Sequence, residues 1–529
     1  MRKFVMAAAA TSVAMLAAMF AAAGADAQQP RTVRVSFNND ATTMDPHANN
    51  AFTTNALLEQ IYECLTTRDK DMKLAPGLAA RWEQTAPTRW RFHLREGVRW
   101  HDGSPFTADD VVFSLKRSVA PTSQYGIYVD SFADAVKIDD RTVEIVTKAV
   151  DLVLPDKLTR VFILSKAWAE ANRAVEPQNF AAREDSYASR NAMGTGPFMF
   201  RSRTPDERTV LVRNPNHWDR NAGGNVEQFV WQPISNDATR IAALLAGDID
   251  ITNFVPPQDL DRLRREPRVK VVDGQENRTL WIGFDQSRDE LLYSDVKGKN
   301  PFKDARVRQA IAHAVDVEAL KTRVMRGQAV PTGSMWTHYV NGYDRALDVR
   351  PALDLPRARA LMAEAGYPNG FQVQIDCPNG NYEQVCVALG GMLAQIGIRL
   401  NVSLQAPAVT FGKFLRQDTS MFAVNWGVPT FDAMYTMRAI MMTREKVGAS
   451  SWNAGQYSNP RVDAAIEAAQ SEVDAEKRRG FMREAMRLHN ADVGHLPLFH
   501  MMIPWAMATR IDVPHRPDNF VIGKWIVAR

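Results

Sequence analysis

Hydrophobic residues along this chain recur with two different periods, and the two kinds of segment alternate. Apolar and polar residues alternate in three short runs, Thr32 to Phe37, Phe371 to Ile375 and Ile398 to Leu404, as in strands with one buried face. Between the last two runs, apolar residues from Val385 to Ile396 recur every three or four positions, as on a helix that ends at Gly397. Strands that alternate with helices predict an α/β fold.

The first predicted strand leads into two further expected features. Asn38 and Asn39 follow it directly, and polar residues just past a strand end either meet a ligand or form a simple turn. The periodicity then predicts a packing helix over Ala51 to Leu65.

Residues 74–148 have a different pattern. Large apolar residues alternate between positions 90 and 94, and a turn rich in Gly and Pro follows. Thr107 is placed to cap a helix with acidic residues in its first turn, where the helix dipole favours negative charge. Val136 to Thr147 reads as a hairpin. Together these elements predict a small α+β unit.

The segment from Met421 to Asp432 is the strongest candidate for a site. Phe422, Val424 and Trp426 alternate as on a buried strand, and Gly427 with the following proline ends it. A strand that ends in this way presents a large aromatic ring beside open backbone. A tryptophan at a strand end is usually a core residue, so the segment alone leaves open whether Trp426 lines a cleft.

Composition favours a globular, exported chain. Its 529 residues are 45% hydrophobic, which predicts about two to four domains. Residues 1–27 read as a signal peptide: basic residues precede an apolar run, and Ala25 to Ala27 forms the cleavage site. The alternative is an uncleaved membrane anchor. The small residues at the end of the apolar run disfavour it, because they are what signal peptidase needs for cleavage. We therefore expect a soluble periplasmic protein after cleavage near Ala27, without a lipid anchor, because no cysteine stands there.

Charge and cysteines narrow the function further. The formal net charge is +4 and the basic residues are dispersed, which excludes an electrostatic nucleic-acid surface. Cys377 and Cys386 flank a short loop, and a disulfide there would contribute about 2 to 3 kcal/mol by loop closure. A zinc site is disfavoured because no further ligand pair is near. Cys64 reads as a buried small hydrophobe.

The chain lacks the local motifs of common enzyme classes. It has no Gly-x-Ser-x-Gly, His-Glu-x-x-His or phosphate-loop motif, although a triad of dispersed residues stays open. His489, His495 and His500 are close in sequence. The last two fall on a predicted strand on opposite faces, so no metal site is predicted there. The sequence predicts no catalytic residue, metal or cofactor.

Several longer motifs then identify a family. The stretch Leu94 to Val111 closely resembles the signature of the family 5 extracellular solute-binding proteins, the periplasmic receptors of dipeptide, oligopeptide and nickel ABC importers. The resemblance continues, in the family's order, through residues 194–198, 212–218, 240–250, 302–311, 363–368 and 457–460.

This resemblance implies the fold and the domain organisation. We expect a periplasmic binding protein-like fold, with two α/β lobes joined by two crossover strands and a small inserted α+β domain. The first lobe is placed at residues 28–61, 190–275 and 490–529, the small domain at 62–189 and the second lobe at 276–489. The crossovers are expected near Arg278 to Phe284 and Leu496 to Trp505.

The resemblance also implies a site. Family members that bind peptides place an Asp three residues after the Trp of this strand, to hold the ligand's ammonium; here that position is Pro429, and the first acid is Asp432. Either Asp432 takes over that role, or, as we favour, the ligand has no free ammonium there, because a buried ammonium without its carboxylate would cost about 3 to 5 kcal/mol. The residues carried over are Asn425, Trp426, Gly427, Val428, Thr430, Phe431 and Asp432, with Asn38 and Asn39 from the first lobe.

The implied function is capture of a peptide-like or other small polar solute by lobe closure, and its delivery to an ABC permease of the inner membrane by a monomeric receptor. The alternatives that remain are a nickel or haem receptor of the same fold, a periplasmic holdase or chaperone, and an exported hydrolase.

Overall fold

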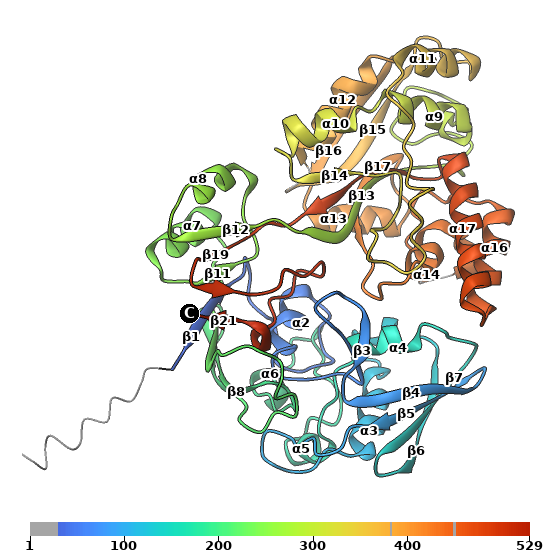
Figure 1. Cartoon of the computed structure of the whole chain (residues 1–529). Coiled ribbons are helices and arrows are strands. Elements are labelled where there is room, and N and C mark those ends of the chain that lie inside the picture. Colours follow the sequence, from blue (N-terminus) through green and yellow to red (C-terminus); the bar gives the residue numbers. More distant parts are fainter. Residues whose placement is uncertain (1–29, 381–382, 448–450) are drawn as a thin grey trace, which may run out of the picture.

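The computed structural model describes residues 30–380, 383–447 and 451–529 (Figure 1). The predicted signal peptide, residues 1–27, lies outside the described residues. No helix in the described part of the chain is both long and apolar enough to cross a membrane.

The first lobe is built on a seven-stranded mixed sheet with the order β12-β19-β11-β1-β10-β9-β8. Its central strand β1 pairs in parallel with β10 and β11, while the other neighbours are antiparallel. Helices α2, α7 and α8 lie in this lobe (Figure 1). The bounds are β1 Thr32–Ser36, α2 Phe52–Leu58, β8 Phe198–Thr204, β9 Arg208–Arg213, β10 Gln228–Trp231, α7 Asp237–Ala246, β11 Ile251–Thr252, α8 Leu260–Arg264, β12 Val269–Val272 and β19 Trp505–Ala508.

The second lobe contains a six-stranded sheet with the order β14-β18-β13-β17-β15-β16. Its central strands β18, β13 and β17 are antiparallel, and β15 pairs in parallel with β16 and β17. The bounds are β13 Gln275–Phe284, α9 Ala305–Ala314, α10 Val317–Ala319, β14 Ala329–Pro331, α11 Leu355–Glu364, β15 Phe371–Pro378, α12 Glu383–Ala394, β16 Ile398–Gln405, α13 Pro407–Leu415, β17 Met421–Gly427, α14 Met434–Thr436, η6 Met437–Met441, α15 Arg444–Val447, α16 Pro460–Ser471, α17 Ala475–Asp492 and β18 Leu496–Met502.

The small α+β unit has a four-stranded sheet with the order β4-β5-β7-β6, against which α3 packs. The predicted cap of α3 is present: Thr107 and Asp110 form a capping box. The bounds are β2 Thr66–Arg68, β3 Leu74–Pro76, β4 Ala79–Ala86, β5 Arg89–Leu94, α3 Ala108–Ser118, β6 Phe132–Asp139, β7 Thr142–Thr147, α4 Leu154–Lys157, α5 Lys166–Ala171 and α6 Tyr187–Arg190; β20 Ile511–Asp512 and β21 Val527–Ala528 pair near the C-terminus.

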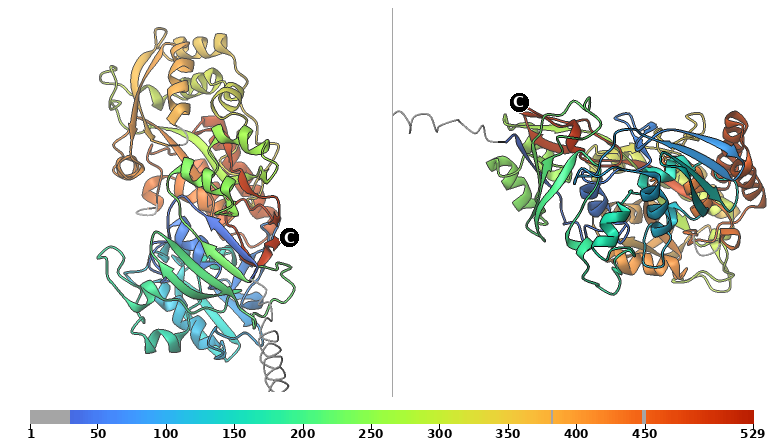
Figure 2. Two further views of the ribbon diagram at one scale, coloured as in Figure 1. Left: turned by 90° about the vertical axis from the view of Figure 1, so that its left-hand side faces the viewer. Right: turned by 90° about the horizontal axis from the view of Figure 1, so that it is seen from below.

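Hydrophobic packing divides the molecule differently from its sheets. One core cluster runs without a break from the first lobe into the small unit. The second lobe has two clusters of its own. The first lobe and the small unit therefore form one body, and the second lobe forms the other; the left view of Figure 2 shows the two bodies apart.

Two antiparallel strand pairs join these bodies. Strand β12 leads into β13, and β18 leads into β19; β12 pairs with β19 in the first lobe, and β13 pairs with β18 in the second. Where the chain changes sheet, the amide of Ile503 donates a hydrogen bond of 2.8 Å to the carbonyl of Gly274. A methyl group on Gly274 would come within 1.9 Å of the His515 ring, so only glycine fits beneath this imidazole.

The strand pairing differs in two places from the expected domain organisation. Strand β18 belongs to the second-lobe sheet, although residues 490–529 were assigned to the first lobe. The changes of sheet fall between β12 and β13 and between β18 and β19, so the first lies before the predicted Arg278. The remaining domain bounds stay a prediction.

The helix expected over Ala51 to Leu65 is also shorter. It ends at Leu58 because the next carbonyls have distant partners. The Gln60 carbonyl accepts from the amide of Phe198, and the Ile61 carbonyl from the amide of Gly196. Residues 59–61 form turns, and these long-range bonds occupy the carbonyls that a continued helix would use for its own hydrogen bonds.

Candidate functional site

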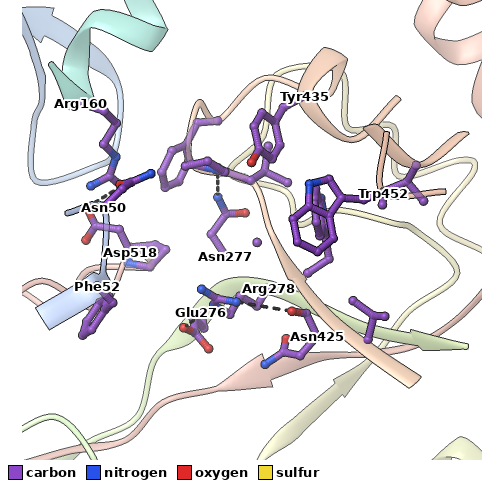
Figure 3. Close-up of a pocket in the computed structure, with 18 of the residues that line it drawn as sticks. Asn50, Phe52, Arg160, Glu276, Asn277, Arg278, Asn425, Tyr435, Trp452 and Asp518 are labelled. Atoms are coloured by element: carbon purple, nitrogen blue, oxygen red, sulfur yellow. Dashed lines mark hydrogen bonds and ion pairs between the residues drawn. The ribbon is translucent and has the colours of Figure 1, made fainter. Parts of the chain in front are cut away.

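A cavity of about 350 Å³ lies between the two bodies, beside the joining strands (Figure 3). Its walls come from three parts of the chain. Its lining includes Asn50, Asn55, Arg160 and Asp518 from the first body, Glu276, Asn277 and Arg278 from β13, and Asn425, Trp426, Tyr435 and Trp452 from the rest of the second lobe.

An aromatic wall forms at the end of β17. The rings of Trp426 and Tyr435 are stacked at a centroid distance of 5.6 Å, and Trp452 lies 6.0 Å from Trp426. The Trp426 indole donates a hydrogen bond of 3.0 Å to the Thr436 hydroxyl. Because that bond fixes the half-buried ring, its face is a preformed surface for an apolar or planar group.

Strand β13 supplies the polar floor of the cavity. Asn277 donates a hydrogen bond of 2.8 Å to the Val428 carbonyl, which ties the joining strand to the loop after β17. Arg278 donates to the Asn425 carbonyl at 3.4 Å, and its Nε lies 3.1 Å from the Glu276 carboxylate. Burial raises the pKa of Glu276, against the opposing effect of Arg278.

The opposite wall carries another arginine and another acid. Arg160 lies with its guanidinium 5.0 Å from the centre of the Phe520 ring and 3.9 Å from the Asp518 carboxylate. Both carboxylate oxygens of Asp518 accept hydrogen bonds from Arg516. Burial opposes ionisation of Asp518, but the charge of Arg516 holds its pKa below the usual value.

Asp432 does not line this cavity, and this corrects its expected role. It is 2% exposed, and both its oxygens accept hydrogen bonds of 2.9 Å from Arg478. Asn341 donates a further bond of 2.8 Å. A carboxylate that is buried and fully paired cannot also hold a ligand ammonium.

The other predicted residues divide into two groups. Asn425, Trp426, Gly427, Val428 and Phe431 line the cavity.

Thr430, Asn38 and Asn39 are not among the lining residues. The Thr430 carbonyl instead accepts a hydrogen bond of 2.7 Å from Arg68 of the first body. Asn50 and Asn55, around the start of α2, lie at the cavity where Asn38 and Asn39 were expected.

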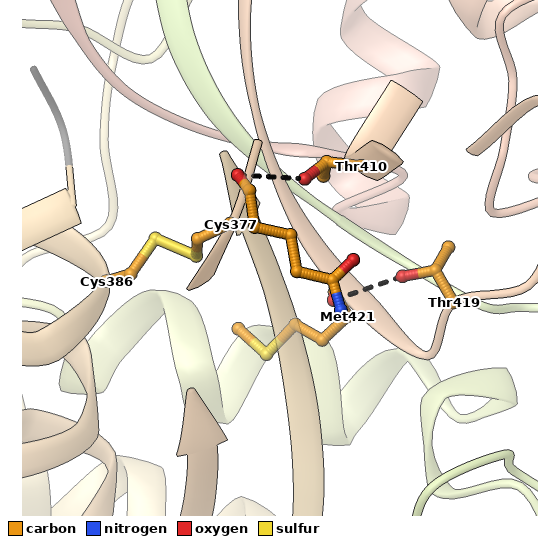
Figure 4. Close-up of a disulfide and its surroundings, with 6 residues drawn as sticks. Cys377, Cys386, Thr410, Thr419 and Met421 are labelled. Atoms are coloured by element: carbon orange, nitrogen blue, oxygen red, sulfur yellow. Dashed lines mark hydrogen bonds between the residues drawn. A yellow bond between two sulfur atoms is a disulfide. The ribbon is translucent and has the colours of Figure 1, made fainter. Parts of the chain in front are cut away.

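The histidines and cysteines lie elsewhere. His489 and His495 are buried against each other, with Nε2 and Nδ1 2.9 Å apart, and burial lowers the pKa of His489 to about 4. The described residues contain no group of three metal-binding side chains. Cys377 and Cys386 form a disulfide that joins the end of β15 to α12 (Figure 4), and Cys64 is buried and unpaired.

Comparisons with known proteins agree with this architecture. Residues 73–446 match the family described as bacterial extracellular solute-binding proteins, family 5 Middle. Heme-binding protein A of Haemophilus influenzae is 25% identical over 476 residues, which cover 84% of this chain and 82% of that protein. The periplasmic oligopeptide-binding protein OppA of the same organism is 25% identical over 502 residues, 89% of this chain and 88% of that protein.

A solved structure, HbpA2 from Haemophilus parasuis, has a TM-score of 0.80 at 21% sequence identity, and the match covers 94% of this chain and 100% of that chain. The predicted fold class is thereby confirmed. The named relatives are binding proteins rather than enzymes.

Proposed function

This chain belongs to the bacterial extracellular solute-binding proteins of family 5, and we propose that it captures a peptide-like solute without a free ammonium group, for an ABC importer. In this proposal the protein acts as a monomer outside the inner membrane, after removal of its signal peptide, and hands the solute unchanged to a permease.

The observation that carries the proposal is the pairing of the carboxylates. Each acidic side chain lining the cavity already contacts an arginine: Glu276 contacts Arg278, and Asp518 contacts Arg516. The acid of the following loop, Asp432, is paired with Arg478. A ligand ammonium would enter without a free carboxylate, and an unpaired buried charge is costly.

Neutral polar groups are better matched to the cavity. Asn50, Asn55 and Asn425 place neutral amides at the cavity, although Asn50 and Asn55 already bond to each other at 2.9 Å. The side-chain oxygen of Asn425 is buried and has no hydrogen-bond partner among the described residues. A ligand N–H would satisfy this acceptor, while the aromatic wall would cover an apolar side chain.

Lobe closure supplies the mechanism. The two joining strand pairs permit rotation of the bodies, and contacts across the gap then favour the closed form. Arg68 makes such a contact: it donates to the Thr430 carbonyl, and its guanidinium lies 5.1 Å from the centre of the Phe431 ring. A solute enclosed between the bodies would stabilise the same arrangement.

A matched pair of peptide libraries tests this function. Equimolar tripeptides, either N-acetylated or with a free amino end and all with a free carboxyl end, are offered to purified, refolded protein. Retained peptides are read by native mass spectrometry. We expect the acetylated set to be retained about a hundredfold better, since about 3 kcal/mol separates a neutral group from an unpaired ammonium.

The aromatic wall provides the matched variants. Trp426→Ala should abolish retention, whereas Trp82→Ala, which removes a half-buried tryptophan of β4 outside the cavity, should not. Retention of the free-amino set in preference to the acetylated one would refute the proposal.

A further inference from the structure

A second cavity, which we call the basic chamber, opens beside the first between the small unit and the second lobe. Its volume is about 580 Å³, and it shares the walls Tyr435 and Trp452 with the first cavity. Both of these side chains are visible at the edge of the first cavity in Figure 3. A solute held at the aromatic wall would therefore reach the basic chamber if it is long enough.

Positive charge predominates in the lining of this chamber. Four basic side chains and two acidic ones line it, and the basic ones come from both bodies. They are Lys148 and Lys157 of the small unit and Arg438 and Arg478 of the second lobe, with Asp130 and Asp151 as the acids.

Asp130 contacts three of these cations, two of them through its carboxylate. Its carboxylate lies 2.7 Å from the Lys157 ammonium and 3.8 Å from the Arg438 guanidinium. Lys148 reaches only the backbone carbonyl of Asp130, at 3.2 Å. Lys157 has a second carboxylate in Asp151, at 2.8 Å. Arg438 and Lys148 are thus the two cations of the chamber with capacity for another anion.

Charged groups of the two bodies meet here. Arg438 belongs to the second lobe, and both lysines and Asp130 belong to the small unit. The Asp130 carboxylate already lies between Arg438 and Lys157. A ligand carboxylate bound by Arg438 and Lys148 would add a second contact between the bodies and so favour closure. The chamber also has apolar walls, among them Ile127, Leu152 and Met434, which suit the side chain beside a terminal carboxylate.

We propose that the basic chamber binds the carboxylate end of the solute through Arg438 and Lys148, while its blocked end packs on Trp426. This proposal rests on the proposed function, because it assigns the other end of the same ligand. The ligand class is then an N-blocked peptide, or a similar elongated amphipathic acid.

The test compares N-acetylated tripeptides that have a free carboxyl end with the same tripeptides amidated at that end. We expect wild-type protein to retain the acids about tenfold better, as two charge-assisted contacts predict. Arg438→Gln with Lys148→Gln should bring the two sets to similar retention. The control, Lys299→Gln with Arg345→Gln, removes two exposed cations outside both cavities and should keep the preference.

The outcomes separate the two proposals. Two results would overturn the proposal for the basic chamber. One is equal retention of acids and amides by wild-type protein, and the other is an unchanged preference for acids in Arg438→Gln with Lys148→Gln. If wild-type protein retains acids and amides equally and Trp426→Ala retains neither, the proposed function stands and only the basic-chamber proposal falls. Retention of neither set would overturn both.

Discussion

The Asp432–Arg478 ion pair gives the sharpest quantitative prediction. It lies beneath the loop that forms one wall of the cavity, and its side chains are only 3% and 9% exposed. In Arg478→Met, Asp432 would keep the hydrogen bonds from Asn341 and the Met434 amide but lose both bonds from the guanidinium. Removing one member of such a buried pair typically costs about 3 to 5 kcal/mol.

The measurement is urea unfolding followed by tryptophan fluorescence, with hydrogen exchange to locate the change, because a two-body protein need not unfold in one step. Exchange at Met434 and Tyr435 should accelerate. A matched control is Arg190→Met, which removes an exposed ion pair with Asp185 and should cost less than about 1 kcal/mol.

A double variant separates pairing from packing. Asp432→Asn with Arg478→Met removes both charges, so it should cost less than the two single changes together. If Arg478→Met alone costs less than about 1 kcal/mol, Asp432 is not held as a buried ion, and its exclusion as a ligand anchor fails.

Three further predictions concern stability and movement. Cys377→Ser with Cys386→Ser should lower the free energy of unfolding by about 2 to 3 kcal/mol, because it reopens a short loop; unchanged melting of the variant would contradict this. His489 has a folded-state pKa of about 4, below the unfolded value of about 6.5, so the unfolded chain binds more protons between these values. As the pH is lowered from 6.5 to 4, His489 should account for roughly 3 kcal/mol of the stability lost, beside the contributions of His495 and His500, whose pKa values burial also lowers. His489→Gln should make the slope shallower by that share, and an equally steep slope would refute the assignment. Gly274→Ala should impair closure, because the added methyl group meets the His515 ring; small-angle scattering with and without ligand measures this. Adding His515→Ala to Gly274→Ala should restore closure. Unimpaired closure in Gly274→Ala would show that this contact does not control the joint.

Much of the fold was predictable because its elements are encoded locally. The strand at Met421–Gly427 and the cap at Thr107 follow from alternation and from side-chain chemistry within a few residues. The family motifs then supplied the order of the lobes, and the family prediction is confirmed. The early end of α2 was not predictable, because it depends on hydrogen bonds to residues 196 and 198.

The site was only partly predictable, for a related reason. The residues after Trp426 were found because they are consecutive in sequence. The polar run Glu276 to Arg278 was missed, since it reaches the cavity only through the pairing of β13 with β17. The role of Asp432 stayed open between two alternatives because its partner Arg478 lies on α17, and no local pattern indicates such a distant pair.

The unbroken core between the first lobe and the small unit has a mechanical consequence. Because these two parts share one core, the proposed closure would turn them about the joining strands as one rigid body. The first cavity contains Glu276, Asn277 and Arg278 of the joint itself, whereas none of these three residues lines the basic chamber. A given rotation therefore moves the walls of the basic chamber through a longer arc. The carboxylate end of the solute, held in the basic chamber, then has the larger effect on whether the two bodies stay closed.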